Sequence, residues 1–165
     1  MQNNNLDIHR ASAEDLAAIN RVVERAVMGW HLPERVKRLA LPTYRYSELD
    51  MTHMQLWIAE TGPAAIAGVI AWEQADVQDT PGGQHALLIH GIYVDPACQR
   101  SGIGSKLLQS AEAAASQAQL NGLLVKAQSG AAGFFHARGY RRLPVTDDLR
   151  EYNNRFWKTL RGRTI

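Results

Sequence analysis

The sequence has a single cysteine, Cys98, among its 165 residues. An internal disulfide and a cysteine cage for a metal ion are therefore excluded. No apolar run approaches the roughly 18 residues that a membrane-spanning helix needs, so no membrane partner is predicted. Residues 1–5 form a polar tail without the apolar segment of a signal peptide, and we expect a cytoplasmic protein.

An excess of charge is also missing. Eighteen Lys and Arg residues against 16 Asp and Glu residues leave a formal net charge of +2, which by itself is too small to indicate nucleic acid binding. The basic residues gather in three short groups, 35–38, 138–142 and 161–163, and each group fits a solvated surface better than a nucleic acid interface. The six histidines show no metal-ligand spacing such as His-x-x-x-His, so no metal is predicted.

The composition is that of an ordinary globular protein, with 45% apolar and 21% charged residues. A chain of this length can bury the core of one domain, and neither a repeat, nor a low-complexity tract, nor a linker divides it. We therefore expect a single domain over residues 6–162.

The most informative stretch runs from Tyr93 to Leu108, where an apolar strand leads through an Asp-Pro turn and a glycine-spaced loop into an amphipathic helix. The start of a helix leaves N–H groups unpaired and carries partial positive charge, so it suits an anion such as phosphate. Gly102 and Gly104 have no Cβ and let a ligand approach the main chain, and Arg100 can add a charged fork. The glycines alone fit a helix cap that binds nothing equally well.

Two other phosphate motifs are excluded in this stretch. A P-loop needs a Lys followed by Ser or Thr after the second glycine, and this loop has none. The dinucleotide-binding fingerprint needs a third glycine where Leu107 stands.

Residues 99–104, Gln-Arg-Ser-Gly-Ile-Gly, resemble the Gln/Arg-x-x-Gly-x-Gly/Ala signature of the GNAT superfamily of N-acetyltransferases, and the Val-Asp-Pro lead-in is similar too. In that family the amides of this loop hold the pyrophosphate of acetyl-coenzyme A (acetyl-CoA). The resemblance therefore implies acetyl-CoA as cosubstrate. It implies cofactor contacts at Ile92, Val94, Gln99, Arg100, Ser101, Gly102, Ile103, Gly104, Ser105, Gln128 and Phe135.

A second segment, residues 128–139, is similar to the family pattern Asn-x-x-Ala-x-x-Leu/Phe-Tyr-x-x-x-Gly-Phe. Two polar members differ, because Gln128 replaces the usual Asn and Phe135 replaces the usual Tyr, which often protonates the departing thiolate. The resemblance thus implies the fold, but it does not imply which residue protonates the departing thiolate. Three residues could supply that proton, and the sequence does not choose among them: Tyr93, Tyr140 and His136.

Hydrophobic periodicity predicts the secondary structure in chain order. We expect strands at 6–10, 55–60, 65–73, 85–94, 123–127, 140–143 and 151–160, helices at 12–28, 34–39 and from 103 to about 120, and a loop at 41–52. A strand, a helix and a strand in succession imply a right-handed crossover. The resemblance adds the fold class: an α/β protein of the α+β type, with a mixed, mostly antiparallel central sheet of about seven strands and helices on both faces.

Acyl transfer to an amine needs a base and a donor for the oxyanion. The family uses a main-chain N–H of its fourth strand as that donor, which maps near residues 92–94 and is worth roughly 3 kcal/mol. His90 is the first candidate for the base, because imidazole exchanges protons near neutral pH and the residue lies four positions before Val94. Glu73 is the second candidate and a solvent relay the alternative, while Tyr93 is the further catalytic candidate.

The amine acceptor is expected to contact aromatic residues of the region after the first helix, which lines the acceptor pocket in the family. The candidates are Trp30, Tyr44 and Tyr46, with Glu73 in addition. A loop that merely covers the core explains these aromatics equally well.

We thus expect an N-acetyltransferase that acts on a primary amine of a small molecule or protein. The alternative is a non-catalytic protein that binds or senses acyl-CoA, and a homodimer is left open.

Overall fold

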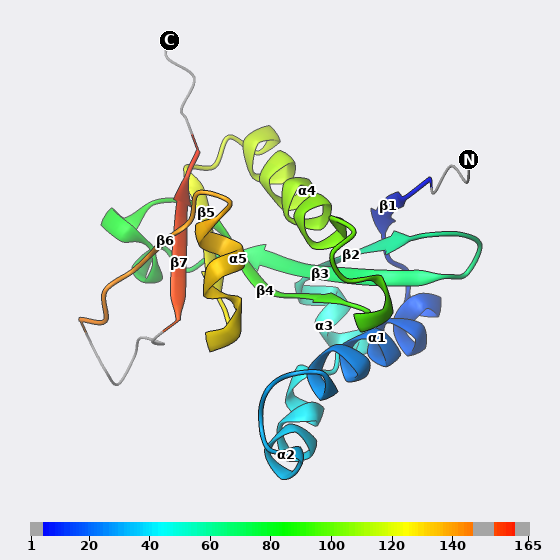
Figure 1. The fold of residues 1–165 in the computed structure, drawn as a ribbon. Helices are drawn as coiled ribbons and strands as arrows, with labels where there is room; N and C mark the ends of the chain where they lie inside the picture. The colour runs from blue at the N-terminus through cyan, green and yellow to red at the C-terminus, as the bar shows by residue number, and fades with distance from the viewer. Residues whose placement is uncertain (1–4, 147–153, 161–165) are drawn as a thin grey trace. The chain divides into compact units, whose positions relative to one another are not determined.

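The computed structural model describes residues 5–146 and 154–160. In this part of the chain, seven strands form one sheet in the order β1-β2-β3-β4-β5-β7-β6 (Figure 1). The strands are β1 (Asp7–Arg10), β2 (Gln55–Glu60), β3 (Ile66–Gln74), β4 (Ala86–Val94), β5 (Gly122–Lys126), β6 (Arg141–Arg142) and β7 (Arg155–Thr159). The helices are α1 (Leu16–Met28), α2 (Glu34–Tyr44), α3 (Glu48–His53), α4 (Ile103–Gln117) and α5 (Ala132–His136).

The predicted mixed, mostly antiparallel sheet is confirmed. The pairs β1–β2, β5–β7 and β6–β7 are antiparallel, and β4–β5 is parallel, as the crossover through α4 requires. Part of the last predicted strand, 151–153, and the basic group 161–163 lie outside the described residues.

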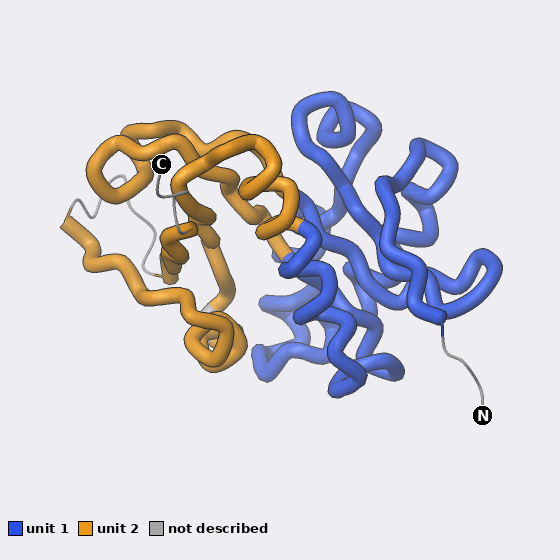
Figure 2. Tube along the Cα trace, turned by 90° about the horizontal axis from the view of Figure 1, so that it is seen from above, with its two compact units in different colours: residues 1–71, 92–110 blue, residues 72–91, 111–165 orange. Residues whose placement is uncertain are grey.

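The chain divides into two compact units, each built from two separate segments (Figure 2). Unit 1 comprises residues 1–71 and 92–110, and unit 2 comprises residues 72–91 and 111–165. β3, β4 and α4 each supply residues to both units. One domain over residues 6–162 therefore stays a prediction.

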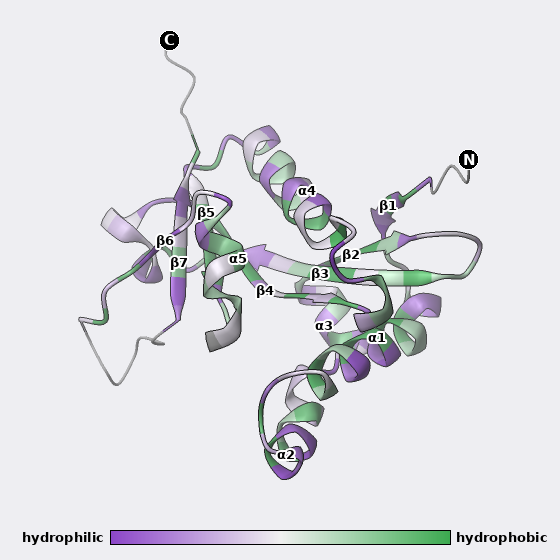
Figure 3. Cartoon of the chain, in the orientation of Figure 1, coloured by the Kyte–Doolittle hydropathy of each residue, from purple (hydrophilic) through white to green (hydrophobic). Residues whose placement is uncertain are grey.

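The first helix of unit 1 forms as its sequence predicts. The N–H of Ser12 donates to the carboxylate of Asp15 at 2.8 Å, which caps the short 3-10 turn leading into α1. α1 ends at Met28, before Gly29. Figure 3 shows hydrophobic and hydrophilic residues alternating around α1, and the hydrophobic ones are buried: Ile19, Val22, Val23, Ala26 and Val27.

The predicted loop over residues 41–52 is wrong. α2 continues through Pro42 to Tyr44, and α3 begins after Ser47. Pro42 lies in the last turn of α2, where its ring removes only one backbone hydrogen bond. Ser47 Oγ accepts the N–H of Asp50 at 3.2 Å, and the Ser47 N–H donates to the Asp50 carboxylate at 2.7 Å. This Ser-x-x-Asp capping box is a sequence signal for α3 that the periodicity did not reveal.

Gly68 on β3 lies directly beneath the first turns of α4, within unit 1. A Cβ at this position would lie 3.0 Å from Ile103 Cγ2, 3.0 Å from Leu107 Cδ1 and 3.2 Å from the carbonyl oxygen of Tyr93. A side chain at this position would therefore crowd both α4 and the end of β4. The glycine lets the start of α4 rest on the sheet.

Replacing Gly68 with Val is expected to lower the free energy of unfolding by about 1–3 kcal/mol, because the side chain overpacks the contact with Ile103 and Leu107. Urea unfolding measures the change. Gly62→Val is the matched control, since nothing lies within 4 Å of a Cβ there, and a change below about 0.5 kcal/mol is expected. Equal losses in the two variants would contradict the packing argument.

The second half of α4 lies in unit 2 and carries a carboxylate with two partners in that unit. Glu112 is half-buried, and its Oε1 accepts from Tyr140 OH at 3.0 Å and Lys158 Nζ at 3.1 Å. Burial, and then the neighbouring Glu112 carboxylate, raise the pKa of the Tyr140 phenol well above its usual value. The buried side of this half of the helix is Ala111 and Ala115. Ala114 is half-buried and Ala118 is exposed.

Candidate functional site

The predicted phosphate loop lies in unit 1, between the end of β4 and the start of α4. A short 3-10 turn, Pro96–Cys98, follows the strand, and Ser101 Oγ donates to the carbonyl oxygen of Cys98. Arg100 (φ +66°) and Gly102 (φ +80°) take left-handed backbone conformations that turn the chain into α4. Only the glycine adopts this conformation without steric cost.

The N-terminus of α4 presents bare amides at this loop. The first bond of the helix runs from the Lys106 N–H to the carbonyl oxygen of Gly102 at 3.1 Å, so the N–H groups of residues 103–105 have no acceptor within the helix. No other group in the described part of the chain accepts from them. Nothing lies within 4 Å of a Cβ built on Gly102, so that side of the loop is open.

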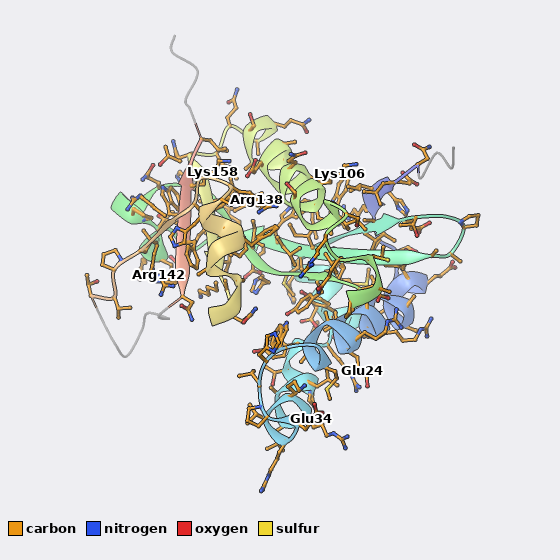
Figure 4. The ribbon with its side chains drawn as sticks, in the orientation of Figure 1. Glu24, Glu34, Lys106, Arg138, Arg142 and Lys158 are labelled. Atoms are coloured by element: carbon orange, nitrogen blue, oxygen red, sulfur yellow. The ribbon has the colours of Figure 1, made fainter. Side chains whose placement is uncertain are left out.

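The electrostatics of this loop favour an anion. The peptide dipoles of α4 add partial positive charge at the three amides. Arg100 and Lys106 are exposed cations on either side of them, and Figure 4 labels Lys106 on α4. The arrangement can hold a phosphate or diphosphate group by main-chain hydrogen bonds and two flanking charges.

Asp95 fixes the approach to the loop. Its Oδ2 accepts from Arg25 Nη2 of α1 at 2.6 Å and Arg25 Nε at 2.9 Å, and its Oδ1 accepts from the Ala97 N–H at 3.0 Å. Its own N–H donates to the carbonyl oxygen of Ala67 on β3 at 2.8 Å. The Asp-Pro turn is thus tied to a helix and a strand of unit 1, which holds the loop in one geometry.

The ladder between β4 and β5 ends early. It pairs Ala86–Ile89 with Gly122–Val125, although β4 continues to Val94 and β5 to Lys126. Residues 90–94 therefore extend past the paired segment, and His90, Ile92 and Val94 share one face of the strand. The oxyanion donor near residues 92–94 stays a prediction.

The two candidate bases form one pair in unit 2. His90 Nε2 lies 2.9 Å from Glu73 Oε1, and the two side chains are 36% and 35% exposed. His90 is thus a surface residue in contact with Glu73. The sequence suggested the two residues separately, because nothing local reveals which residues of β3 and β4 lie side by side.

Three of the four predicted acceptor residues, Trp30, Tyr44 and Tyr46, lie in an aromatic cluster in unit 1, whereas Glu73 lies in unit 2. The rings of Trp30 and Tyr44 meet edge to face at 5.2 Å, and Tyr93 lies 6.4 Å from Tyr44 and 6.3 Å from Tyr46 between ring centroids. Tyr46 and Tyr93 are buried, and burial raises the pKa of both phenols. Trp30 and Tyr44 are half-buried and leave part of each ring accessible. Tyr93, the further catalytic candidate, is therefore a buried phenol of this cluster.

Asn20 is a residue of this site that the sequence analysis missed. Its Nδ2 donates to the carbonyl oxygen of Tyr46 at 2.8 Å, and its Oδ1 accepts the N–H of Tyr46 at 2.9 Å. These two bonds fix Tyr46 to α1. The sequence did contain a signal for this contact. Asn has a low helix propensity, and an Asn inside a helix of otherwise favourable residues indicates that its side chain bonds to another part of the chain.

The second family-like segment, in unit 2, serves mainly as structure. Gln128 Oε1 accepts the Gly130 N–H at 2.7 Å and caps the turn before α5. Phe135 is 4% exposed and stacks on Phe156 with ring centroids 5.7 Å apart. Among the substitutes for the missing acid, Tyr140 donates to Glu112, whereas His136 is exposed and meets Phe156 edge to face at 5.3 Å.

Two further features concern the described residues alone. Residues 5–146 and 154–160 contain no group of three or more His, Cys, Asp or Glu side chains able to hold a metal ion. None of the helices in this part of the chain has both the length and the apolar character to cross a membrane.

A model of the acetyltransferase (GNAT) domain family matches residues 34–155 of this sequence. Among proteins with curated descriptions, none matches the sequence significantly. Solved structures do match the fold. The PaiA N-acetyltransferase of Thermoplasma acidophilum, solved with coenzyme A, has 15% identity and a TM-score of 0.75 over 94% of this chain and 99% of its own.

Two other structures have the same fold at comparable identity. A GNAT-family acetyltransferase of Staphylococcus aureus Mu50 has 15% identity and a TM-score of 0.70, over 94% of this chain and 99% of that one. A GNAT-family acetyltransferase of Brucella melitensis, in complex with acetyl-CoA, has 20% identity and a TM-score of 0.57, with 84% of each chain covered.

Proposed function

Because the chain belongs to the GNAT family of acetyltransferases, we propose that it moves the acetyl group of acetyl-CoA to a primary amine of a small molecule or protein. The observation that carries the proposal is the set of bare amides at the start of α4, residues 103–105, in the loop that bears the family signature. We also propose that the protein is cytoplasmic and that it binds neither nucleic acid nor a membrane. Whether it forms a homodimer is left open.

Coenzyme A is proposed to bind through its diphosphate at these amides. Arg100 and Lys106 add charge on either side, and the open face at Gly102 admits the ligand to the main chain. Structures with the same fold contain coenzyme A in one case and acetyl-CoA in another, which supports this choice of cosubstrate.

The transfer needs one proton acceptor and one oxyanion donor. The amine nitrogen attacks the acetyl carbon, the N–C bond forms, and the C–S bond breaks with its electron pair leaving on sulfur. The amine's proton goes to His90, and a main-chain N–H of residues 92–94 stabilises the tetrahedral oxyanion by roughly 3 kcal/mol. A thiol of pKa roughly 8.5 leaves readily as thiolate, so Phe135 in place of an acid does not prevent the reaction, and solvent supplies the final proton.

The half-buried rings of Trp30 and Tyr44 are proposed to hold the carbon skeleton of the acceptor. Trp30→Ala is expected to raise the KM for the amine by about tenfold, since it removes roughly 1–2 kcal/mol of apolar contact. The KM for acetyl-CoA is expected to stay constant. Leu32→Ala, an exposed apolar residue two positions along, is the control and should leave both constants unchanged. Equal effects on the two substrates would contradict this assignment.

The test of the function itself is turnover. The protein is incubated with acetyl-CoA and a panel of amines that includes amino acids, polyamines, aminoglycosides and peptides, and free thiol is followed. We expect thiol release above the hydrolysis background with at least one class, and an acetylated amine by mass spectrometry. Thermal stabilisation by acetyl-CoA without thiol release across the panel would instead favour an acyl-CoA sensor, which the missing hydroxyl at Phe135 suggests as the second candidate.

A further inference from the structure

We propose that Glu73 is a positioning residue for His90, and that Nδ1 of His90 is the atom that accepts the proton. This inference rests on the proposed function and names the atoms of its base. His90 and Glu73, which the sequence offered as alternative bases, then act together as a base and the residue that orients it.

The geometry fixes which ring nitrogen is free. Glu73 Oε1 lies 2.9 Å from Nε2 of His90, across the neighbouring strands β3 and β4 of unit 2. An ionised carboxylate accepts hydrogen bonds and cannot donate them, so Nε2 carries the proton of the neutral imidazole. The lone pair is then on Nδ1, which has no protein partner in the described part of the chain.

The same pairing explains why imidazole and not the carboxylate serves as the base. A carboxylate is a weaker base than imidazole by roughly two pKa units in water, and one oxygen of Glu73 is already occupied. When Nδ1 takes a proton, the positive charge forms beside the Glu73 carboxylate, which stabilises it. The Glu73 carboxylate stays ionised throughout. The aspartate of a Ser-His-Asp triad behaves in the same way and does not take the proton.

The partial exposure of Glu73 and His90 allows the positioning role of Glu73 to be tested in variants that still fold. Both side chains are about one-third exposed, and an ion pair in such a position contributes about 0–1 kcal/mol to stability. Variants at Glu73 are therefore expected to fold. The chain also offers a matched control in unit 1, where His9 Nε2 lies 3.2 Å from Glu60 Oε1 across β1 and β2.

The kinetic experiment compares three variants with an amine that the protein acetylates. Glu73→Leu is expected to lower kcat by about tenfold or more, with the KM for acetyl-CoA constant. Glu73→Gln keeps an acceptor oxygen and is expected to retain more activity than the leucine variant. Glu60→Leu should leave kcat unchanged. Full kcat in Glu73→Leu would overturn the positioning role.

The second readout is independent of turnover. Nitrogen-15 NMR of the ring nitrogens, with His90 assigned by the loss of its signals in His90→Gln, reports the tautomer of the free protein at alkaline pH. We expect a protonated Nε2 and an unprotonated Nδ1 in the wild type, and a mixture in Glu73→Leu. A protonated Nδ1 in the wild type would overturn the inference. If no amine is acetylated, the proposed function fails, and the tautomer still decides whether Glu73 orients His90.

Discussion

Replacing His90 with Gln is expected to lower kcat by about a hundredfold, because a positioned base contributes that much or more to proton transfer. The affinity for acetyl-CoA is expected to be unchanged, since the proposed diphosphate site is at the start of α4. The side chain is more than one-third exposed, so the variant should fold. Steady-state kinetics with saturating acetyl-CoA measures kcat, and calorimetry measures the affinity.

His85→Gln is the matched control for this result. His85 is exposed and stands immediately before β4, so the same chemical change occurs outside the Glu73–His90 pair. Unchanged kinetics are expected. A His90→Gln variant with wild-type kcat would mean that solvent, and not this histidine, removes the proton.

Ser105→Asp is expected to weaken acetyl-CoA binding by about a hundredfold while leaving the free protein as stable or slightly more stable. Ser105 is the third residue of α4, where a carboxylate stabilises the helix N-terminus by about 0.3–1 kcal/mol. The same negative charge repels a diphosphate, and two unit charges at 4 Å interact by roughly 4 kcal/mol at the effective dielectric near a protein surface. Thermal unfolding with and without acetyl-CoA checks both effects.

Gln109→Asp makes the same change of charge one turn further along α4, at an exposed position. Its effect on binding should be small, because the influence of the helix terminus falls off within the first turn. If both variants bound acetyl-CoA equally well, the start of α4 would not be the diphosphate site. In Ser105→Asp the stability of the free protein is expected to stay equal or rise while the affinity for acetyl-CoA falls. This combination distinguishes loss of the ligand site from loss of the fold.

Features that depend on a few neighbouring residues were predictable from the sequence. The predicted helix over 12–28 and the predicted strands over 55–60 and 65–73 follow from local patterns, and the structure confirms them as α1 with its preceding 3-10 turn, β2 and β3. Gly102 takes a left-handed conformation, which a glycine adopts without steric cost. The sequence therefore placed the loop that presents bare amides, and its role in binding stays a proposal.

Features that depend on long-range register were not predictable. Glu73 and His90 are separated by 17 positions, and only the alignment of β3 with β4 brings them together. The two partners of Glu112, Tyr140 and Lys158, lie 28 and 46 positions away from it in the sequence. The predicted loop over residues 41–52 is wrong for a related reason, because the packing of α2 against the core of unit 1 outweighs local sequence preference.

The most direct test of the central claim is a calorimetric titration of the wild-type protein with coenzyme A and acetyl-CoA, repeated with Ser105→Asp. The account predicts one site per chain for the wild type, competition by inorganic pyrophosphate, and about a hundredfold loss of affinity in the variant. Wild-type protein that binds no coenzyme A species, or a variant that binds as tightly as the wild type, would contradict it.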